Sequence, residues 1–385
     1  MSSTVNSWKI SSAQAEELAR QHGTPLYIYD SKIVRRQIDS FRAAFSRFDH
    51  RIHYAMKANS NTSLLHLMKE LGMGIDAVSI DEIRISLEVG FCASDIIFTP
   101  NGVAFEELQQ AIDLGVRLNI ENLSYLEKLG EAHGGDVPCT LRVHPGLVIP
   151  EASRDATGWY QRSRFGIDRQ QIPLALQIIK KHAIRVEALH VHSSSMILDE
   201  TVFGAAAKIL IDLARELPDV VALDLGGGIR PPHHADDDHP DLDALARSLE
   251  KPLSEFQQET GRKLQLWFEP GRYLVSECGL LVTRANVIKK VGDRTVVGVD
   301  TGFHQLIRPK LYGARHEIVN LSRPEGPLHD YDICGCLCEE DELAGNRSLP
   351  QVHEGDLLGI LNAGAYGFSM ASTYNARPVP AEVMI

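Results

Sequence analysis

The stretch His53–Ser60 (HYAMKANS) joins a strand-like run to a single lysine, Lys57, and then to the polar start of a helix. That helix is predicted over residues 62–71, where apolar residues recur at helical spacing. A lysine at the end of a buried strand is costly to desolvate unless its ammonium forms an ion pair or a Schiff base. An ordinary paired lysine remains the alternative, so the interpretation of Lys57 depends on the rest of the chain.

Strands and helices alternate from this stretch onward. Apolar, β-branched runs predict strands at 52–56, 75–78, 96–99, 117–121, 140–144, 186–190, 220–225 and 265–269. Helical spacing predicts helices at 62–71, 81–89, 105–114, 124–133, 171–182, 201–216 and 242–258. This order predicts an α/β fold, a (β/α)8 TIM-like barrel, with a doubly wound open sheet as the alternative.

The pattern changes after residue 271. Strand-like runs at 280–290, 295–299, 318–321, 332–337 and 356–361 are separated by Gly, Pro and Asn, without a long helix. We therefore expect a barrel over 31–272 and a β-sandwich or β-barrel domain built from 1–30 and 273–385, joined by an early strand at 25–29.

Composition excludes several classes of protein. The 385 residues contain 44% hydrophobic and 23% charged residues, as in ordinary globular proteins. The 39 basic and 51 acidic residues give a net charge of −12, which disfavours binding to nucleic acid or an anionic membrane. No apolar run is long enough for a membrane span, and no signal-peptide core is present. Six cysteines in a chain of this length predict reduced thiols and a cytoplasmic location.

Reactive and flexible residues gather where the predicted barrel strands end. Lys57, His190 and Glu269 each lie at a strand end, and Gly226–Gly228 follows another. In such barrels the C-terminal strand ends carry the chemistry, and the turns after the last two strands commonly bind phosphate. A phosphate seat, a Schiff-base lysine and a carboxylate for a ring nitrogen together indicate a pyridoxal phosphate site. Taken alone, the three glycines equally suit an ordinary tight turn.

Two other clusters resemble metal sites. Cys334, Cys336 and Cys338 alternate and are expected on one face of a strand, but they lack the Cys-x-x-Cys spacing of zinc sites. The run at 233–239 combines histidines and aspartates, which a solvated loop explains more simply. We therefore predict no metal.

The ordered motifs carry a family resemblance over nearly the whole chain. They are Tyr54–Ser60 (YAMKANS), 165–167 (FGI), 190–193 (HVHS), 225–228 (LGGG), 269–272 (EPGR), 307–313 (IRPKLYG), 338–339 (CE), 364–367 (GAYG) and 374–378 (YNARP). On these motifs the chain resembles the fold-type III pyridoxal phosphate decarboxylases, with the alanine racemase and ornithine decarboxylase type of fold. It is most similar to the diaminopimelate decarboxylases.

The resemblance implies a role for each matching residue. Lys57 would hold the cofactor aldehyde, His190 would stack on its ring, and Glu269 would pair with the ring nitrogen. The phosphate would be bound by Ser193, Gly226, Gly227, Gly228, Gly271, Arg272 and Tyr366. Cys338 would return a proton to the carbanion and would come from the neighbouring subunit, which implies a homodimer with shared sites. The substrate's remaining groups would be held by Arg272, Arg308, Tyr312, Glu339 and Tyr366.

Two motifs depart from the diaminopimelate decarboxylase pattern. Residues 190–194 read HVHSS where that group usually has HIGSQ, and 338–342 read CEEDE where it has CESGD. The first departure is closer to decarboxylases of siderophore pathways, which act on citrate-containing intermediates. We expect conversion of meso-diaminopimelate to L-lysine and CO2, with a citryl-diamino acid as the competing substrate. A racemase-like enzyme and a non-catalytic regulatory homologue are the alternatives from other classes.

Overall fold

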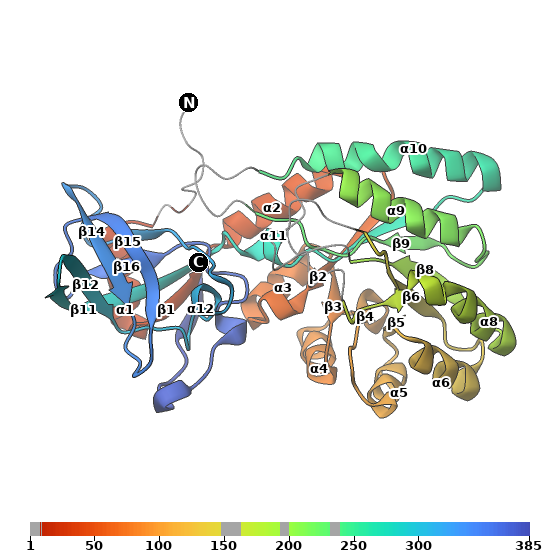
Figure 1. Cartoon of the computed structure of the whole chain (residues 1–385), viewed down its shortest axis with the longest axis horizontal. Helices are drawn as coiled ribbons and strands as arrows, with labels where there is room; N and C mark the ends of the chain where they lie inside the picture. The colour runs from red at the N-terminus through yellow and green to blue at the C-terminus, as the bar shows by residue number, and fades with distance from the viewer. Residues whose placement is uncertain (1–7, 9, 148–162, 193–199, 232–238) are drawn as a thin grey trace.

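The computed structural model describes residues 8, 10–147, 163–192, 200–231 and 239–385. Two parts are visible in Figure 1: a ring of strands surrounded by helices, and a second domain made mainly of strands. No helix among the described residues has both the length and the apolar character needed to cross a bilayer.

Eight parallel strands form the closed barrel predicted from the sequence. They are β2 (His50–Ala55), β3 (Gly74–Ala77), β4 (Ile96–Phe98), β5 (Arg117–Ile120), β6 (Cys139–His144), β8 (Val186–His190), β9 (Ala222–Asp224) and β10 (Gln265–Phe268). The neighbours run β5-β4-β3-β2-β10-β9-β8-β6, and pairing of β5 with β6 closes the ring. The two-residue β7 (Ile167–Asp168) pairs with β6 alone. Closure rules out the open-sheet alternative.

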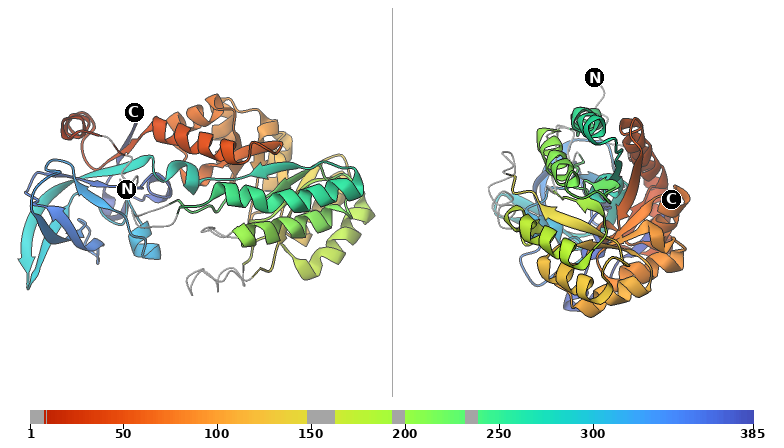
Figure 2. Two further views of the ribbon diagram at one scale, coloured as in Figure 1. Left: turned by 90° about the horizontal axis from the view of Figure 1, so that it is seen from above. Right: turned by 90° about the vertical axis from the view of Figure 1, so that its right-hand side faces the viewer.

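Helices form the outer layer of the barrel (Figure 2). They are α2 (Ser31–Ala44), α3 (Thr62–Glu70), α4 (Ile80–Val89), α5 (Phe105–Asp113), α6 (Leu123–His133), α8 (Ile172–His182), α9 (Glu200–Ala214) and α10 (Leu242–Thr260). Polar residues just before several of them accept hydrogen bonds from first-turn amides: Asn61 for α3, Ser79 for α4, Asn122 for α6 and Asp241 for α10. These caps fix where each helix begins; α4 and α6 begin within a few residues of a strand end.

The second domain consists mainly of strands, as expected, and they form a mixed sheet. It contains β1 (Leu26–Tyr29), β11 (Gly279–Val291), β12 (Arg294–Val299), β13 (Ile318–Asn320), β14 (Leu328–Cys334), β15 (Glu342–Pro350), β16 (Leu357–Ile360) and β17 (Ala381–Met384), with α1 (Ser12–His22) packed against it. The early strand β1 pairs with β11 and β17, which confirms that the N-terminal strand joins this domain.

Several short elements differ from the sequence prediction. Helices α11 (Arg272–Val275) and α12 (Arg308–Tyr312) were not predicted, and neither were the single 3-10 turns η1 (Met56–Ala58), η2 (Ala93–Asp95), η3 (Arg169–Gln171), η4 (Phe368–Met370) and η5 (Tyr374–Ala376). The expectation that the cysteines at 334, 336 and 338 share one strand face is wrong, because β14 ends at Cys334. Segments of three to five residues contain too few residues to show a period.

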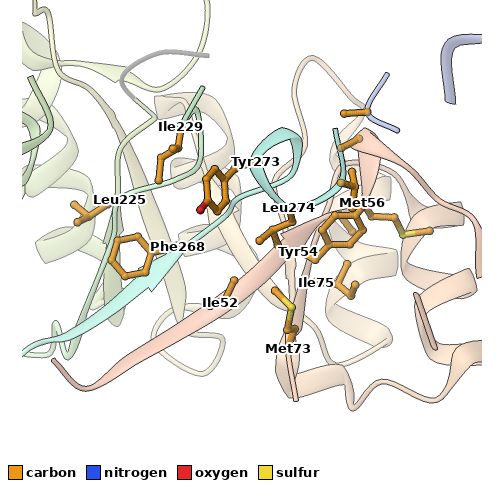
Figure 3. Packing of buried hydrophobic residues seen from close by; sticks show 14 of the residues in the cluster. Ile52, Tyr54, Met56, Met73, Ile75, Leu225, Ile229, Phe268, Tyr273 and Leu274 are labelled. Atoms are coloured by element: carbon orange, nitrogen blue, oxygen red, sulfur yellow. The ribbon is translucent and has the colours of Figure 1, made fainter. Parts of the chain in front are cut away.

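The barrel core holds the strand ends in place. Phe268 of β10 pairs in register with Ile52 of β2, and Figure 3 shows both with Leu225 in the same buried cluster. The Phe268 ring lies 4.5 Å from the Phe45 ring, and the Tyr54 hydroxyl donates to the Asn59 carbonyl at 2.8 Å. Burying each such side chain contributes about 1.5–3 kcal/mol. The residue after Phe268 is Glu269, so this packing also positions a site residue.

Candidate active site

The barrel interior determines which polar residues meet at its mouth. Ile97, Ala188, Ala222 and Trp267 come from four strands and form a buried cluster of their own, separate from the layer between strands and helices. Because side chains two apart on a strand share a face, the next interior residues are Thr99, His190, Asp224 and Glu269. All four are buried, and they follow the apolar layer toward the C-terminal strand ends. An apolar layer is therefore succeeded by a polar one.

Lys57 forms an ion pair inside this mouth. It lies in η1, directly after β2, and its ammonium contacts the fully buried carboxylate of Asp76 on β3. Burial opposes the charge on Lys57, but Asp76, Tyr366 and Glu269 together more than compensate, so the pKa of Lys57 is raised above its usual value. The Lys57 side chain is still 40% exposed, so its amine is accessible from outside the barrel. An accessible amine beside a buried carboxylate can bind an aldehyde.

Glu269 and His190 form a second pair. Nε2 of His190 lies 3.3 Å from Oε2 of Glu269, and Asn119 donates to Nδ1 of His190. Because an amide N–H can only donate, Nδ1 of His190 accepts this bond, and Nε2 is the ring nitrogen nearer Glu269. Although burial disfavours a charged Glu269, His190 and Lys57 hold the pKa of Glu269 well below its usual range. The Oε1 atom of Glu269 has no donor among the described residues and can accept a proton-bearing ring nitrogen.

The glycine turn after β9 packs closely against the strand end that carries Glu269. Gly226 has φ +67°, and a Cβ on Gly227 would lie 2.2 Å from the Glu269 carbonyl oxygen. The Gly227 amide donates to Nδ1 of His192 at 3.3 Å. Burial and nearby Arg142 lower the pKa of His192 to about 3, so this ring is neutral at neutral pH. One of the three amides expected to bind phosphate is therefore already bonded to His192.

Two arginines supply positive charge beside the turn. The Arg272 guanidinium lies 4.7 Å from the centre of the Tyr366 ring, and the Tyr366 amide donates to the carbonyl of Ala58 at 2.8 Å. Burial and the charge of Arg272 lower the pKa of Arg308 to about 10. Nη1 of Arg272 and Nε of Arg308 are buried without an acceptor in the described chain. Two close, incompletely paired cations suit an anionic ligand.

Gly271 packs closely against the end of β2 and the 3-10 turn η1, which carries Lys57. A Cβ on Gly271 would lie 3.0 Å from the carbonyl oxygen of Ala55 and from the Cβ of Ala58, so only glycine fits this approach easily.

Ser193 lies outside the described residues, as does the 233–238 part of the histidine and aspartate run.

Two predicted residues, Cys338 and Glu339, make their hydrogen bonds within the second domain of the single chain. Cys338 is exposed and bonds to Asn375, while Glu339 accepts from the Tyr374 hydroxyl at 3.1 Å. Tyr312 is 64% exposed. Among the residues described, neither Cys338 nor Glu339 hydrogen-bonds to the barrel.

The residues at the mouth fit pyridoxal phosphate. Bound there, the cofactor would have an amine for its aldehyde in Lys57, a carboxylate for its ring nitrogen in Glu269, and a flat imidazole in His190. Glycine amides and arginines would face its phosphate. His190, Asp224 and Glu269 each offer one atom within 4.8 Å of the others, a spacing that a metal ion could also use.

Sequence reasoning gave no role to three buried polar residues of the site: Asp76, Asn119 and Asp224. Each interrupts an apolar strand near its C-terminal end, which is the signal that could have identified them. The partner of each depends on contacts across the barrel.

Comparisons with known proteins agree with this geometry. Residues 31–276 match the family model described as pyridoxal-dependent decarboxylase, pyridoxal binding domain. A diaminopimelate decarboxylase of Methanothermobacter thermautotrophicus is 37% identical, over 98% of this chain and 90% of the relative. The one from Escherichia coli K12 is 33% identical, over 96% and 91%. A crystal structure of the Helicobacter pylori diaminopimelate decarboxylase complexed with L-lysine superimposes with a TM-score of 0.88, at 31% identity, covering 96% and 93%.

Proposed function

Because the chain belongs to the pyridoxal-dependent decarboxylase family, we propose that it converts meso-diaminopimelate to L-lysine and CO2 in lysine biosynthesis. The chain is a carboxy-lyase whose cofactor is pyridoxal 5'-phosphate. One observation carries the proposal. The Lys57–Asp76 ion pair and the ionised carboxylate of Glu269 lie together at the mouth of the same barrel.

Each residue at the barrel mouth has a separate role. When bound, the cofactor supplies an electron sink for the electron pair left by departing CO2. Lys57 holds the aldehyde, and Asp76 orients its amine. Glu269 keeps a proton on the ring nitrogen, since its own pKa is held low. His190, whose ring is oriented by Asn119, would offer its flat face to the cofactor ring.

Cys338 would supply the proton that replaces the departing CO2, and it would do so across a homodimer interface. Two observations support this assignment. Cys338 bonds within its own second domain and not to its own barrel among the described residues. Large side chains nearby are exposed, including Tyr312 at 64% and Tyr374 at 39%, as expected for a surface covered by a second copy. Each mouth would then be completed by the partner's loop.

Charged side chains recognise the distal groups of the substrate. Arg272 and Arg308 hold a distal carboxylate with Tyr312 and Tyr366, because guanidinium groups bind carboxylates at two points. Glu339 faces the distal ammonium. A substrate with a carboxylate in place of that ammonium would meet Glu339 at ~4 Å, a repulsion of about 4 kcal/mol at intermediate dielectric. The L-lysine in the Helicobacter pylori relative's crystal carries such an ammonium.

His192 favours a second candidate substrate, a citryl-diamino acid. Its ring stands beside the glycine turn, where the diaminopimelate decarboxylase pattern has no side chain. The deciding assay measures CO2 release from meso-diaminopimelate, lysine, ornithine and a citryl-diamino acid side by side. We expect meso-diaminopimelate to be preferred. A tenfold preference for the citryl compound in kcat/KM, about 1.4 kcal/mol, would overturn the assignment.

We also propose that the enzyme is cytoplasmic. We further propose that the boundary between its two domains lies at residue 272. Support for the location comes from six cysteines that form no disulfide, all of them in described residues. Support for the division comes from the family match over 31–276.

A further inference from the structure

Asp224 is a fully buried carboxyl group to which the proposed function gives no task. It ends β9, and its Oδ1 accepts the Gly226 amide at 2.8 Å. Its Oδ2 is buried and has no donor among the described residues. The carboxyl group lies beside Glu269 and His190, with one atom of each within 4.8 Å of the others. A buried acid in this position needs either a cation or a proton.

Among the described residues, no ion pair joins a cation to Asp224. Asp76, Asp224 and Glu269 are three buried carboxyl groups, and the adjacent lysine, Lys57, pairs with Asp76. The ring proton of bound cofactor would balance Glu269. Arg142 adds a positive charge on β6, but its guanidinium stacks 4.9 Å from the Phe165 ring. A second negative charge next to Glu269 would be repelled strongly in a site that excludes water.

We propose that Asp224 is a protonated carboxylic acid that donates its O–H to Glu269 and so positions Glu269 for the ring nitrogen. Without that proton, two acceptor oxygens would face each other. With it, one becomes a donor and the pair becomes a hydrogen bond. Burial and Glu269 both raise the pKa of Asp224 well above its usual value.

This placement connects two parts of the cofactor site. Oδ1 of Asp224 holds the Gly226 amide, and the Gly226 carbonyl accepts the Glu269 amide at 2.7 Å. Asp224 therefore fixes the glycine turn with one oxygen and Glu269 with the other. It is a positioning residue, since it acts on the cofactor only through these neighbours.

Two substitutions separate a neutral acid from a carboxylate. Asp224→Asn keeps the shape, an oxygen for Gly226 and an N–H donor for Glu269, whereas Asp224→Ala removes both bonds. Asp224→Ala is expected to weaken pyridoxal phosphate binding about tenfold or more, since a bond to a charged group is lost. Asp224→Asn is expected to restore most of that affinity, measured by fluorescence titration. Equal weakening by Asn and Ala would overturn the proposal.

Infrared spectroscopy tests the proton itself. The cofactor-loaded protein at neutral pH is expected to show a carboxylic-acid C=O band that shifts in D2O, disappears in Asp224→Asn and persists in Asp76→Asn. Absence of the band, or its retention in Asp224→Asn, would overturn the proposal even if Asp224→Ala fails to fold. The inference rests on the proposed role of Glu269, but the infrared result needs no turnover. A wrong substrate assignment would therefore leave it unaffected.

Discussion

Replacing Glu269 by Gln removes the negative charge that the site provides for a ring nitrogen. The side chain is buried, Oε2 lies 3.3 Å from the His190 ring, and Oε1 is without a donor among the described residues. The glutamine amide keeps the shape of the side chain but carries no negative charge. Loss of a hydrogen bond between charged groups costs about 1.5–3 kcal/mol, which corresponds to roughly 10- to 150-fold weaker cofactor binding.

The affinity of Glu269→Gln for pyridoxal phosphate can be measured by fluorescence titration of the apoprotein, and kcat by CO2 release. We expect both the affinity and kcat to fall. Folding stability should change little, because the amide keeps the shape of the side chain and removes the cost of burying a negative charge.

A matched control uses a carboxylate at the opposite end of the barrel. Glu187 pairs with Arg117, the first residue of β5, and both are partly buried. Glu187→Gln should lower stability and leave cofactor affinity as in the wild type, because the N-terminal strand ends carry no part of the site. If Glu269→Gln binds the cofactor as tightly as Glu187→Gln does, with normal kcat, the role given to Glu269 is refuted.

Three further outcomes are expected. Lys57→Ala and Cys338→Ala proteins should each be nearly inactive, and an equal mixture should recover up to about a quarter of wild-type activity, because random exchange gives one intact site in half of the dimers; no recovery despite proven exchange would contradict a shared site. Burial lowers the pKa of His53 to about 4, so the unfolded chain takes up the proton first on acidification. The free energy of unfolding, measured in urea, should fall by about 3 kcal/mol between pH 6.5 and pH 4, and His53→Gln should reduce this pH dependence. An unchanged pH dependence in His53→Gln would refute the role given to His53. Phe268→Ala, which removes a ring packed 4.5 Å from Phe45, should cost about 3–5 kcal/mol of unfolding free energy, and a loss below about 1 kcal/mol would contradict the packing.

The barrel could be predicted because its signals are local. Each strand is a short apolar run between a helix and a turn, and β8 was predicted with its observed bounds. The other barrel strands begin or end one to two residues from the prediction, since pairing with neighbours decides the ends. In the second domain, β14 begins four residues earlier than predicted, and β15 was not predicted. The short helices α11 and α12 were missed, and so was the end of β14 before Cys336. The predicted domain boundary at residue 272 stays a prediction.

The site was predictable where it consists of strand ends, and not where it depends on contacts across the barrel. Lys57, His190 and Glu269 do come together, because parallel strands end at one face. The bond between Asn119 and His190 joins β5 to β8, which are separated by β6, so no sequence spacing reveals it. The charge state of Asp224 likewise depends on a neighbour from another strand.

The most direct test of the account is chemical labelling of the lysine. Borohydride reduction of the cofactor-loaded protein, followed by peptide mapping, fixes the cofactor to the amine that holds its aldehyde. The account predicts the label on the peptide that contains Lys57, and none in Lys57→Ala protein that still folds and dimerises. A label on another lysine, or undiminished labelling of Lys57→Ala, would contradict it.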